Sequence, residues 1–364
     1  MCNQQEQALG VPEKCESGGQ DRKALETDLA GMDIPIISPG SRVYVAGHTG
    51  MVGSAIMRRL VDNGTNDIVT RRHAELDLLD QAAVAAFFRQ EEIDCVILAA
   101  ARVGGILANS TYPADFIYQN LVMETNVIHA AWQAGVQDLV FLGSSCIYPR
   151  LAPQPMKEEY LLTGPLEQTN EPYAIAKIAG IKMCKAWNRQ YGTRYFAVMP
   201  TNLYGPGDHY DLNDSHVLPA LIRKMHEAKE QGAGSVVVWG TGTPRREFLH
   251  CDDLADAVVF LLRCDRAEVF SLFPDQGDPL INIGCGRDVT IAGLAGLVRD
   301  VVGFRGEIVW DRSKPDGTPQ KLLDISRITG LGWQPRISLR EGIEQTYQRF
   351  LEEVAPRLAS SHGG

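Results

Sequence analysis

Three glycines at three-residue intervals, in the segment Gly47–Gly53 with the sequence GHTGMVG, constrain the fold of this chain more than any other feature. An apolar run precedes them at residues 42–46, and apolar residues recur every four positions over 52–60 after them. A strand, a glycine-rich turn and a helix in this order present free backbone N–H groups at the start of the helix, where a phosphate binds. The segment therefore predicts the first unit of a dinucleotide-binding fold. Its phosphate-binding residues are predicted to be Gly47, His48, Thr49, Gly50, Met51, Val52 and Gly53.

Apolar runs with the character of buried strands follow at residues 67–70, 95–101 and 138–145, with helical patterns at 80–90 and 113–133 between them. Continuous apolar strands that alternate with helices are typical of a parallel sheet covered on both faces. Later strands are expected at 195–199, 235–239 and 281–283. The predicted fold class is α/β: a doubly wound parallel sheet of the Rossmann type with a smaller C-terminal α/β substrate domain.

We expect three parts along the chain. Residues 1–40, rich in Gln, Glu, Gly and Asp, are predicted to be a disordered N-terminal extension. Residues 41–204 and 247–284 are assigned to the dinucleotide-binding domain. Residues 205–246 and 285–355 break the regular alternation and contain Pro/Gly-rich pieces, so they are assigned to the substrate-binding domain.

The composition limits the partners and the compartment. A formal net charge of -10 argues against nucleic acid as a partner, because binding a phosphate backbone needs a cationic face. The eight cysteines include no CxxC pair, so free thiols in a reducing cytoplasm are expected. We find no uninterrupted apolar run of transmembrane length and no signal pattern, and we expect no membrane partner. No metal site is predicted.

The end of the second predicted strand indicates which dinucleotide binds. An enzyme that prefers NAD places an acidic residue there to hold the ribose hydroxyls. Here the residues are Arg71, Arg72 and His73. Guanidinium groups bind phosphate with paired, charge-assisted hydrogen bonds, which suits the 2′-phosphate of NADPH. The alternative is that the two arginines are ordinary surface residues.

The spacing YxxxK, from Tyr173 to Lys177, puts a phenol and an ammonium group on one face of a predicted helix. A nearby cation lowers the pKa of a tyrosine, so Tyr173 is predicted to donate a proton to a carbonyl oxygen during reduction. Lys177 is predicted to reach the ribose hydroxyls of the cofactor. Ser144, at the end of a predicted strand, lies where ligands bind in such sheets and can polarise the same carbonyl. A chance YxxxK pair is the alternative, which the order of the three features disfavours.

Two further residues point beyond reduction. Cys146 follows Ser144 by two positions, and His216 stands just before an apparent helix. A thiol and an imidazole can move protons near neutral pH. Each also has a simpler interpretation, as a small buried hydrophobic residue and as a hydrogen-bonded structural residue.

Several motifs together resemble the GDP-L-fucose synthases, a family of extended short-chain dehydrogenases/reductases. The resemblance covers about residues 41–351. The motifs lie at residues 46–56, 104–106, 112–117, 144–149, 171–177, 200–206 and 246–250.

The resemblance implies an activity. The substrate would be GDP-4-keto-6-deoxy-D-mannose, epimerised at C3 and C5 and then reduced at C4 with NADPH. Ser144 and Tyr173 would stabilise the enolate oxygen, while Cys146 and His216 would act as base and acid. The same resemblance implies a homodimer formed through the long helices of the cofactor domain.

The resemblance also implies binding residues. Those for the GDP-sugar are Lys224, Trp239, Arg246 and Asp316. Those for NADP(H) include Leu142, Lys177, Pro200, Thr201, Asn202, Leu203 and His216. The chain departs from the family in its N-terminal extension and in carrying His73 at the position for the 2′-phosphate, with Arg71 and Arg72 just before it.

Two rival functions remain open at this point. A related 4-epimerase or 4,6-dehydratase acting on another nucleotide sugar is one. A dehydratase is expected to carry acidic residues where this chain has Ser145 and Cys146, and a 4-epimerase needs no Cys/His proton pair. The other is a non-enzymatic NADPH-binding regulator, which needs the glycine loop but not Ser144, Tyr173 and Lys177.

Overall fold

The computed structural model describes residues 34–212, 214–314 and 316–361. Among them a six-stranded sheet has the order β2-β1-β3-β4-β5-β9. All of its neighbouring strands run parallel. Its strands are β1 (Val43–Ala46), β2 (Ile68–Val69), β3 (Cys95–Leu98), β4 (Asp138–Leu142), β5 (Arg194–Pro200) and β9 (Leu280–Ile283).

Helices cover both faces of this sheet because successive strand residues point to opposite sides. In β3, Val96 and Leu98 belong to one hydrophobic core, while Cys95 and Ile97 belong to the other. The first core is closed by α3 (Gln81–Gln90), α5 (Pro113–Gln133) and α6 (Glu171–Tyr191). The second is closed by α2 (Met51–Asp62) and α8 (Cys251–Arg263).

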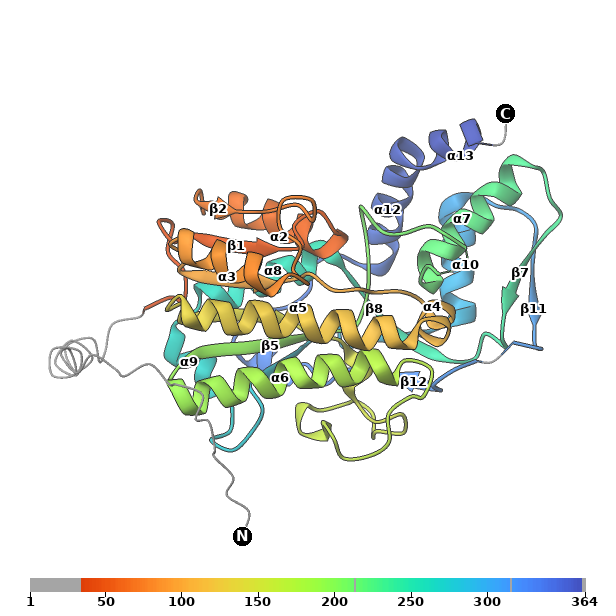
Figure 1. The fold of residues 1–364 in the computed structure, drawn as a ribbon. Coiled ribbons are helices and arrows are strands. Elements are labelled where there is room, and N and C mark those ends of the chain that lie inside the picture. Colours follow the sequence, from red (N-terminus) through yellow and green to blue (C-terminus); the bar gives the residue numbers. More distant parts are fainter. Residues whose placement is uncertain (1–33, 213, 315, 362–364) are drawn as a thin grey trace, which may run out of the picture. The chain divides into compact units, whose positions relative to one another are not determined.

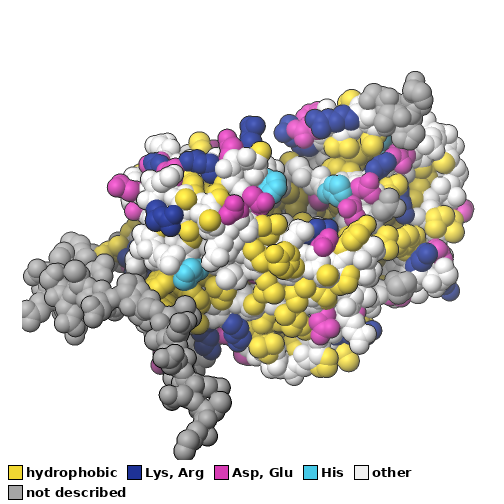
Figure 2. All heavy atoms as spheres, in the orientation of Figure 1, with side chains coloured by type: hydrophobic (Ala, Val, Ile, Leu, Met, Phe, Trp, Pro, Cys, Tyr) yellow, Lys and Arg dark blue, Asp and Glu magenta, His cyan; other side chains and the backbone are white. Residues whose placement is uncertain are grey.

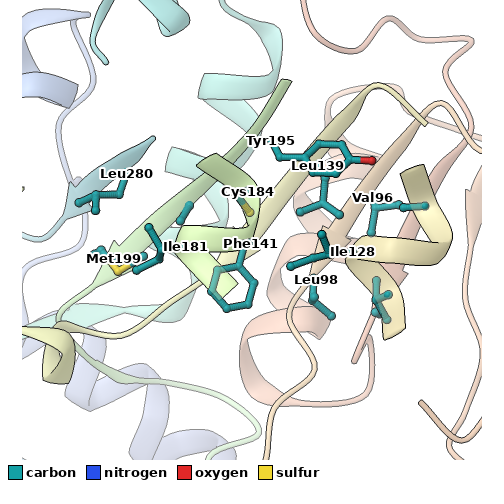
Figure 3. Close-up of a cluster of buried hydrophobic side chains, with 14 of the residues drawn as sticks. Val96, Leu98, Ile128, Leu139, Phe141, Ile181, Cys184, Tyr195, Met199 and Leu280 are labelled. Carbon is teal, nitrogen blue, oxygen red and sulfur yellow. The ribbon is translucent and has the colours of Figure 1, made fainter. Parts of the chain in front are cut away.

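The two longest of these helices, α5 and α6, lie side by side across the first face (Figure 1). Figure 3 shows how they meet the sheet: Ile128 of α5 and Ile181 of α6 point toward strand side chains such as Phe141. This packing fixes the relative positions of residues on α5 and α6, which matters for the site described below.

A second group of elements follows the main sheet. A smaller sheet has the strand order β10-β8-β12, and β6 also pairs with β8. These strands are β6 (Asn202–Tyr204), β8 (Arg245–His250), β10 (Asp288–Thr290) and β12 (Gln320–Lys321). A two-stranded parallel ribbon joins β7 (Ser235–Trp239) to β11 (Glu307–Asp311). A third core packs against them from α7 (Val217–Glu230), α10 (Ile291–Val302) and α12 (Leu339–Glu353).

Short elements complete the described chain. The helices are α4 (Ile106–Thr111), α9 (Arg266–Ser271), α11 (Ser326–Gly330) and α13 (Ala355–Ser361). Two 3₁₀ turns are η1 (Ser145–Ile147) and η2 (Glu158–Tyr160). None of the described helices is long and apolar enough to cross a membrane.

The predicted α/β fold and parallel sheet are confirmed. β3 and β4 end at Leu98 and Leu142, whereas their apolar runs predicted ends at residues 101 and 145. The polypeptide leaves the sheet and enters a loop after each of these strands. The predicted disordered extension comprises residues 1–40, of which residues 1–33 lie outside the described residues. Its boundary is too late, since Ile36 and Ile37 are buried in the second core and the Ile37 N–H donates to the Leu262 carbonyl at 2.9 Å. The division into two domains stays a prediction.

Candidate active site

The glycine loop joins β1 to α2 at the carboxyl edge of the sheet, and its three glycines are required for different reasons. Gly47 has φ +85°, and a Cβ there would lie 2.7 Å from the Ala100 nitrogen beyond β3. A Cβ on Gly53 would overlap the Gly47 carbonyl oxygen, so this glycine lets the helix approach the loop. Around Gly50 a Cβ would meet only the Gly47 oxygen, at 3.6 Å. The middle glycine therefore faces open space where a pyrophosphate can approach the backbone.

The start of α2 offers hydrogen-bond donors. Its N-cap is Gly50, which provides no side-chain cap. The first turn contains no acidic residue that would compete for these donors. Uncapped N–H groups and the positive end of the helix dipole favour an anion at this point. Thr49 and Gly50 are exposed, while His48, Met51 and Val52 are partly exposed, and Gly53 is buried against the loop.

The three residues after β2 differ in their availability for a 2′-phosphate. The Arg71 guanidinium pairs with Glu91 and lies 5.2 Å from the centre of the Phe87 ring. His73 is 82% exposed and its Nδ1 is 3.7 Å from an Asp77 carboxylate oxygen. The Arg72 side chain is exposed, and the described contacts give its guanidinium no partner. Among the three, Arg72 is the one whose charge is available to a ligand.

The end of β4 brings the predicted serine, thiol and phenol together. Ser144 is the N-cap of η1, and its Oγ accepts a hydrogen bond from the Cys146 N–H at 3.4 Å. Burial raises the pKa of the Cys146 thiol and of the Tyr173 phenol, and interaction with Ser144 opposes the change at both groups. Cys146 is 6% exposed and belongs to the first core, against which Tyr173 packs. The structure thus brings the three predicted residues together, and their catalytic roles stay a prediction.

Lys177 has a buried partner in addition to the predicted neighbour Tyr173. Its Nζ lies 2.9 Å from a carboxylate oxygen of Glu124 on α5, and both side chains are 1% exposed. The same Nζ is 4.6 Å from the centre of the Phe141 ring and 5.8 Å from that of Tyr173. The ammonium group is therefore neutralised by a buried carboxylate that the sequence analysis did not identify.

The predicted lowering of the Tyr173 pKa is wrong for this structure. Burial raises the pKa of Tyr173 well above its ordinary value, and the charges of Cys146 and Glu124 raise it further. The hydrogen bond with Ser144 opposes them. The physical reason is that Lys177 is paired with Glu124, so no uncompensated positive charge faces the phenol. Tyr173 is thus held as the protonated form that a proton donor requires.

His216 is the N-cap residue of α7. The surrounding protein lowers the pKa of His216 by displacing water, and His209 lowers it further, while Asp214 raises it. The loop at residues 104–106 contacts the segment just before His216. The Gly105 N–H donates to the Asp214 carbonyl at 2.7 Å, and a Cβ on Gly105 would lie 2.8 Å from that oxygen. No described contact joins His216 to Cys146.

The predicted cofactor-lining residues Pro200, Thr201, Asn202 and Leu203 span the end of β5 and the start of β6. Leu142 ends β4 at the same edge of the sheet. The side chains of Thr201 and Asn202 donate to the Glu247 carbonyl oxygen at 3.2 and 2.8 Å. This stretch is therefore held by β8.

The buried Glu247 side chain fastens three segments. One carboxylate oxygen accepts from the N–H groups of Cys285 and Gly286, each at 2.7 Å, and the other accepts from the Leu323 N–H at 3.0 Å. Burial raises the pKa of Glu247, and these hydrogen bonds oppose the change. Because the residues after β9 and β12 meet at one carboxylate, the edge of the main sheet is tied to the smaller sheet.

The four predicted substrate-binding residues form a cluster on the second group of elements. The Lys224 Nζ lies 5.6 Å from the centre of the Trp239 ring, which is 53% exposed. Asp316 accepts from the Thr241 N–H at 2.7 Å and from its hydroxyl at 2.8 Å, which holds the turn after β7. Arg246 is partly buried, which lowers its pKa, and the charge of Asp316 opposes this.

The structure adds two cationic residues that the sequence analysis missed. Lys321 on β12 pairs in register with Arg246, and its charge lowers the pKa of Cys146 against the larger raising effect of burial. The Lys314 Nζ lies 5.2 Å from the centre of the Trp239 ring, beside Lys224. The motif KPDGTPQK contains both lysines, but their partners are distant in sequence, so no local pattern identifies them.

One cluster of described residues has the atom types of a metal site. Atoms of His250, Cys251 and Asp252 lie within 4.8 Å of one another. Asp252 is already paired with Arg58 at 2.6 Å, and burial raises the pKa of Cys251 to about 12. A protonated thiol and a paired carboxylate are poor ligands, so this cluster does not favour a metal.

A glycine loop at the edge of a parallel sheet, followed by Ser144, Tyr173 and Lys177, defines a nicotinamide-dependent enzyme of the extended short-chain dehydrogenase/reductase class. Residues 43–272 match the NAD dependent epimerase/dehydratase family. GDP-L-fucose synthase 1 of Arabidopsis thaliana is 57% identical over 331 residues, which covers 91% of this chain and 99% of the relative. GDP-L-fucose synthase of Escherichia coli K12 is 57% identical over 314 residues, which covers 85% of this chain and 97% of the relative. The chain belongs to the GDP-L-fucose synthase family.

A solved structure points the same way. The GDP-L-fucose synthetase of Naegleria fowleri bound to NADP matches with a TM-score of 0.78 and 27% identity, covering 88% of this chain and 97% of that one. The open approach to Gly50, the uncapped start of α2 and the exposed Arg72 fit the pyrophosphate and the 2′-phosphate of NADP(H). NADP(H) is the cofactor of this enzyme.

Proposed function

We propose that this enzyme epimerises GDP-4-keto-6-deoxy-D-mannose at C3 and C5 and then reduces C4 with NADPH, giving GDP-L-fucose. The observation that carries the proposal is the grouping of three side chains: the Ser144 Oγ accepts from the Cys146 N–H at 3.4 Å, and Tyr173 packs against the core that contains Cys146. The site thus brings together a group suited to removing a proton from carbon and a group suited to protonating an oxygen. The high identity to GDP-L-fucose synthases over most of the chain supports the same function.

The chemistry follows from where the ketone would sit. Both C3 and C5 are next to C4, so loss of a proton from either carbon places negative charge on the C4 oxygen. We propose that Ser144 and Tyr173 hydrogen-bond that oxygen, because donors aimed at developing charge stabilise the transition state most. Cys146 would accept the proton from carbon as a thiolate, and His216 would return a proton from the opposite side.

The reduction uses the same oxygen. Bound NADPH supplies the hydride. Tyr173 is held protonated by its raised pKa, so it can donate to the C4 oxygen as the carbonyl is reduced. The GDP part would lie on the second group of elements, with Trp239 against the base and Arg246 on the diphosphate. These residue roles and the individual contacts to the 2′-phosphate are part of the proposal.

The test is a direct assay. Purified protein is mixed with NADPH and GDP-4-keto-6-deoxy-D-mannose, and nicotinamide absorbance is followed while the sugar is analysed by NMR. The expected result is stoichiometric NADPH oxidation with inversion at C3 and C5. NADPH oxidation without inversion would reduce the function to that of a C4 reductase, and no oxidation would remove the proposal.

We also propose a homodimer formed through α5 and α6. Figure 2 shows hydrophobic side chains gathered over the region of these helices. Tyr118 on α5 is 63% exposed, and Tyr191 and Ile175 on α6 are 43% and 38% exposed. Exposed apolar patches of this kind mark association surfaces.

We further propose a cytoplasmic location. The free thiols of the described cysteines support a reducing compartment.

A further inference from the structure

The buried pair of Glu124 and Lys177 is the feature of this molecule that its proposed chemistry does not yet use. Glu124 lies on α5, in the middle of a helix whose neighbouring buried residues include Val127 and Ile128. A carboxylate in such a position costs free energy unless an opposite charge meets it. Here the opposite charge is the lysine of the YxxxK motif, at 2.9 Å.

We propose that Glu124 is a positioning residue of the reducing centre: through its ion pair it holds the Lys177 side chain behind Tyr173, the proton donor. The inference rests on the proposed function, because it assigns Tyr173 as the proton donor to the C4 oxygen. It adds a third ionisable group to the pair that the YxxxK spacing identifies.

The backbone of α6 is built to admit this carboxylate. Gly180, which lies three residues after Lys177, is a glycine inside a helix, where it costs helix stability. A Cβ at this position would lie 2.5 Å from the Phe141 ring and 3.1 Å from a carboxylate oxygen of Glu124. The missing side chain therefore leaves the space in which Glu124, Phe141 and Lys177 meet.

The surrounding groups leave Glu124 no other cation in this structure. The described contacts give its carboxylate no ion pair except the one with Lys177. The titratable groups that interact with the pair are Tyr173 and Cys184 on α6 and Cys146 on η1. From β4, the apolar Phe141 ring faces the ammonium group. Lys177 thus has one strong partner, and its position follows from that partner.

The electrostatic consequence has a definite sign. The charge of Glu124 raises the pKa of Tyr173, so removing that charge lowers it. Ionisation of the phenol at a lower pH ends the activity of the reducing centre at a lower pH. The pH profile of reduction is therefore the measurement that separates a positioning role from a structural one.

The experiment compares the full chain with Glu124→Gln, which removes the charge and keeps the shape. Single-turnover reduction at C4 is measured against pH, together with the Kd for NADPH. The expected result is that the alkaline limb of the reduction rate moves to lower pH by about one unit, which is about a tenfold loss of rate on that limb. The Kd for NADPH is expected to change by less than about threefold, since the ion pair of Glu124 is with Lys177 and no described contact joins Glu124 to the glycine loop.

A matched control is Asn126→Ser on the same helix. Asn126 is buried, and its amide donates to the Leu78 carbonyl at 2.9 Å. This variant is expected to lower the Tm without moving the alkaline limb. Two results would overturn the inference. One is a folded Glu124→Gln variant whose alkaline limb lies at the same pH as that of the wild type. The other is an Asn126→Ser variant whose alkaline limb moves as far as that of Glu124→Gln.

Two further measurements keep the inference testable if the first variant does not fold or if the substrate is wrong. Glu124→Asp withdraws the carboxylate from Lys177 by one methylene group. Its alkaline limb is expected to move to lower pH by less than that of Glu124→Gln, and an alkaline limb at the wild-type pH contradicts the inference. Independently of any substrate, ultraviolet titration of tyrosinate, corrected with Tyr173→Phe, should show ionisation of Tyr173 at lower pH in Glu124→Gln or Glu124→Asp. No change there overturns the inference, whereas failure of the wild type to oxidise NADPH overturns only the proposed function.

Discussion

At the scale of single residues, the site depends on how charge and burial act on a few side chains. Tyr173, Cys146 and Lys177 are all held in the first core or against it. In water a phenol beside a lysine would become more acidic, but here burial and a neighbouring carboxylate act in the opposite direction. The residue types were evident from the sequence, whereas their ionisation depends on partners brought together by folding.

Tyr173→Phe tests the proton donor. Removing the hydroxyl is expected to lower kcat for reduction by about 10²–10⁴-fold, the usual contribution of a positioned general acid. The Kd for NADPH should stay close to that of the wild type, because the described ring contacts of Tyr173 are with Phe116 and Lys177 and not with the glycine loop. Stopped-flow reduction and fluorescence titration of NADPH measure the two quantities. A variant that reduces the ketone at the wild-type rate would exclude Tyr173.

Lys321→Met tests the thiol. The charge of Lys321 lowers the pKa of Cys146, so its loss raises that pKa further above the ordinary value. A base acts as the thiolate, which forms only as pH rises through the pKa, and the pH profile of proton exchange should therefore move to higher pH. Exchange of the C3 and C5 protons is followed by NMR in deuterated water. A profile that stays in place, or moves to lower pH, contradicts this assignment.

At the scale of elements, the glycine loop and the strands were predictable because their signals are local. The turn after β1 and the apolar runs of β3 and β4 can be identified within a few residues. The pairings of Glu124 with Lys177, and of Glu247 with the N–H groups of residues 285–286 and 323, join segments far apart in the chain. No window of sequence contains both partners, so these parts of the site needed the fold.

Two alanine substitutions separate the roles of the loop glycines. Gly53→Ala places a Cβ against the Gly47 carbonyl, so it should destabilise the protein by about 1–3 kcal/mol. Gly50→Ala meets no such overlap and should leave stability nearly unchanged, yet it fills the space for the pyrophosphate and should weaken NADPH binding. Urea denaturation and NADPH titration measure both effects. Equal destabilisation by the two variants would contradict the assigned roles.

At the scale of the whole molecule, the exposed apolar surface of α5 and α6 predicts association. Tyr118→Glu combined with Ile175→Glu introduces charge on that surface, which is unfavourable in an apolar interface. Sedimentation velocity should show a dimer for the wild type and a monomer for the double variant. Val61→Glu, at a 56% exposed position on α2, is the matched control and should remain dimeric. A wild type that sediments as a monomer rules out the proposed dimer.

The Glu247 carboxylate has a consequence for the free energy of ligand binding. It joins the end of the main sheet to the strands that carry Arg246 and Lys321. The proposed surfaces for the hydride donor and for the sugar nucleotide are therefore set in register before either ligand arrives. A preassembled pair of surfaces loses little affinity to rearrangement, so the attraction of the nucleotide end of the substrate remains available to orient the ketone at the other end.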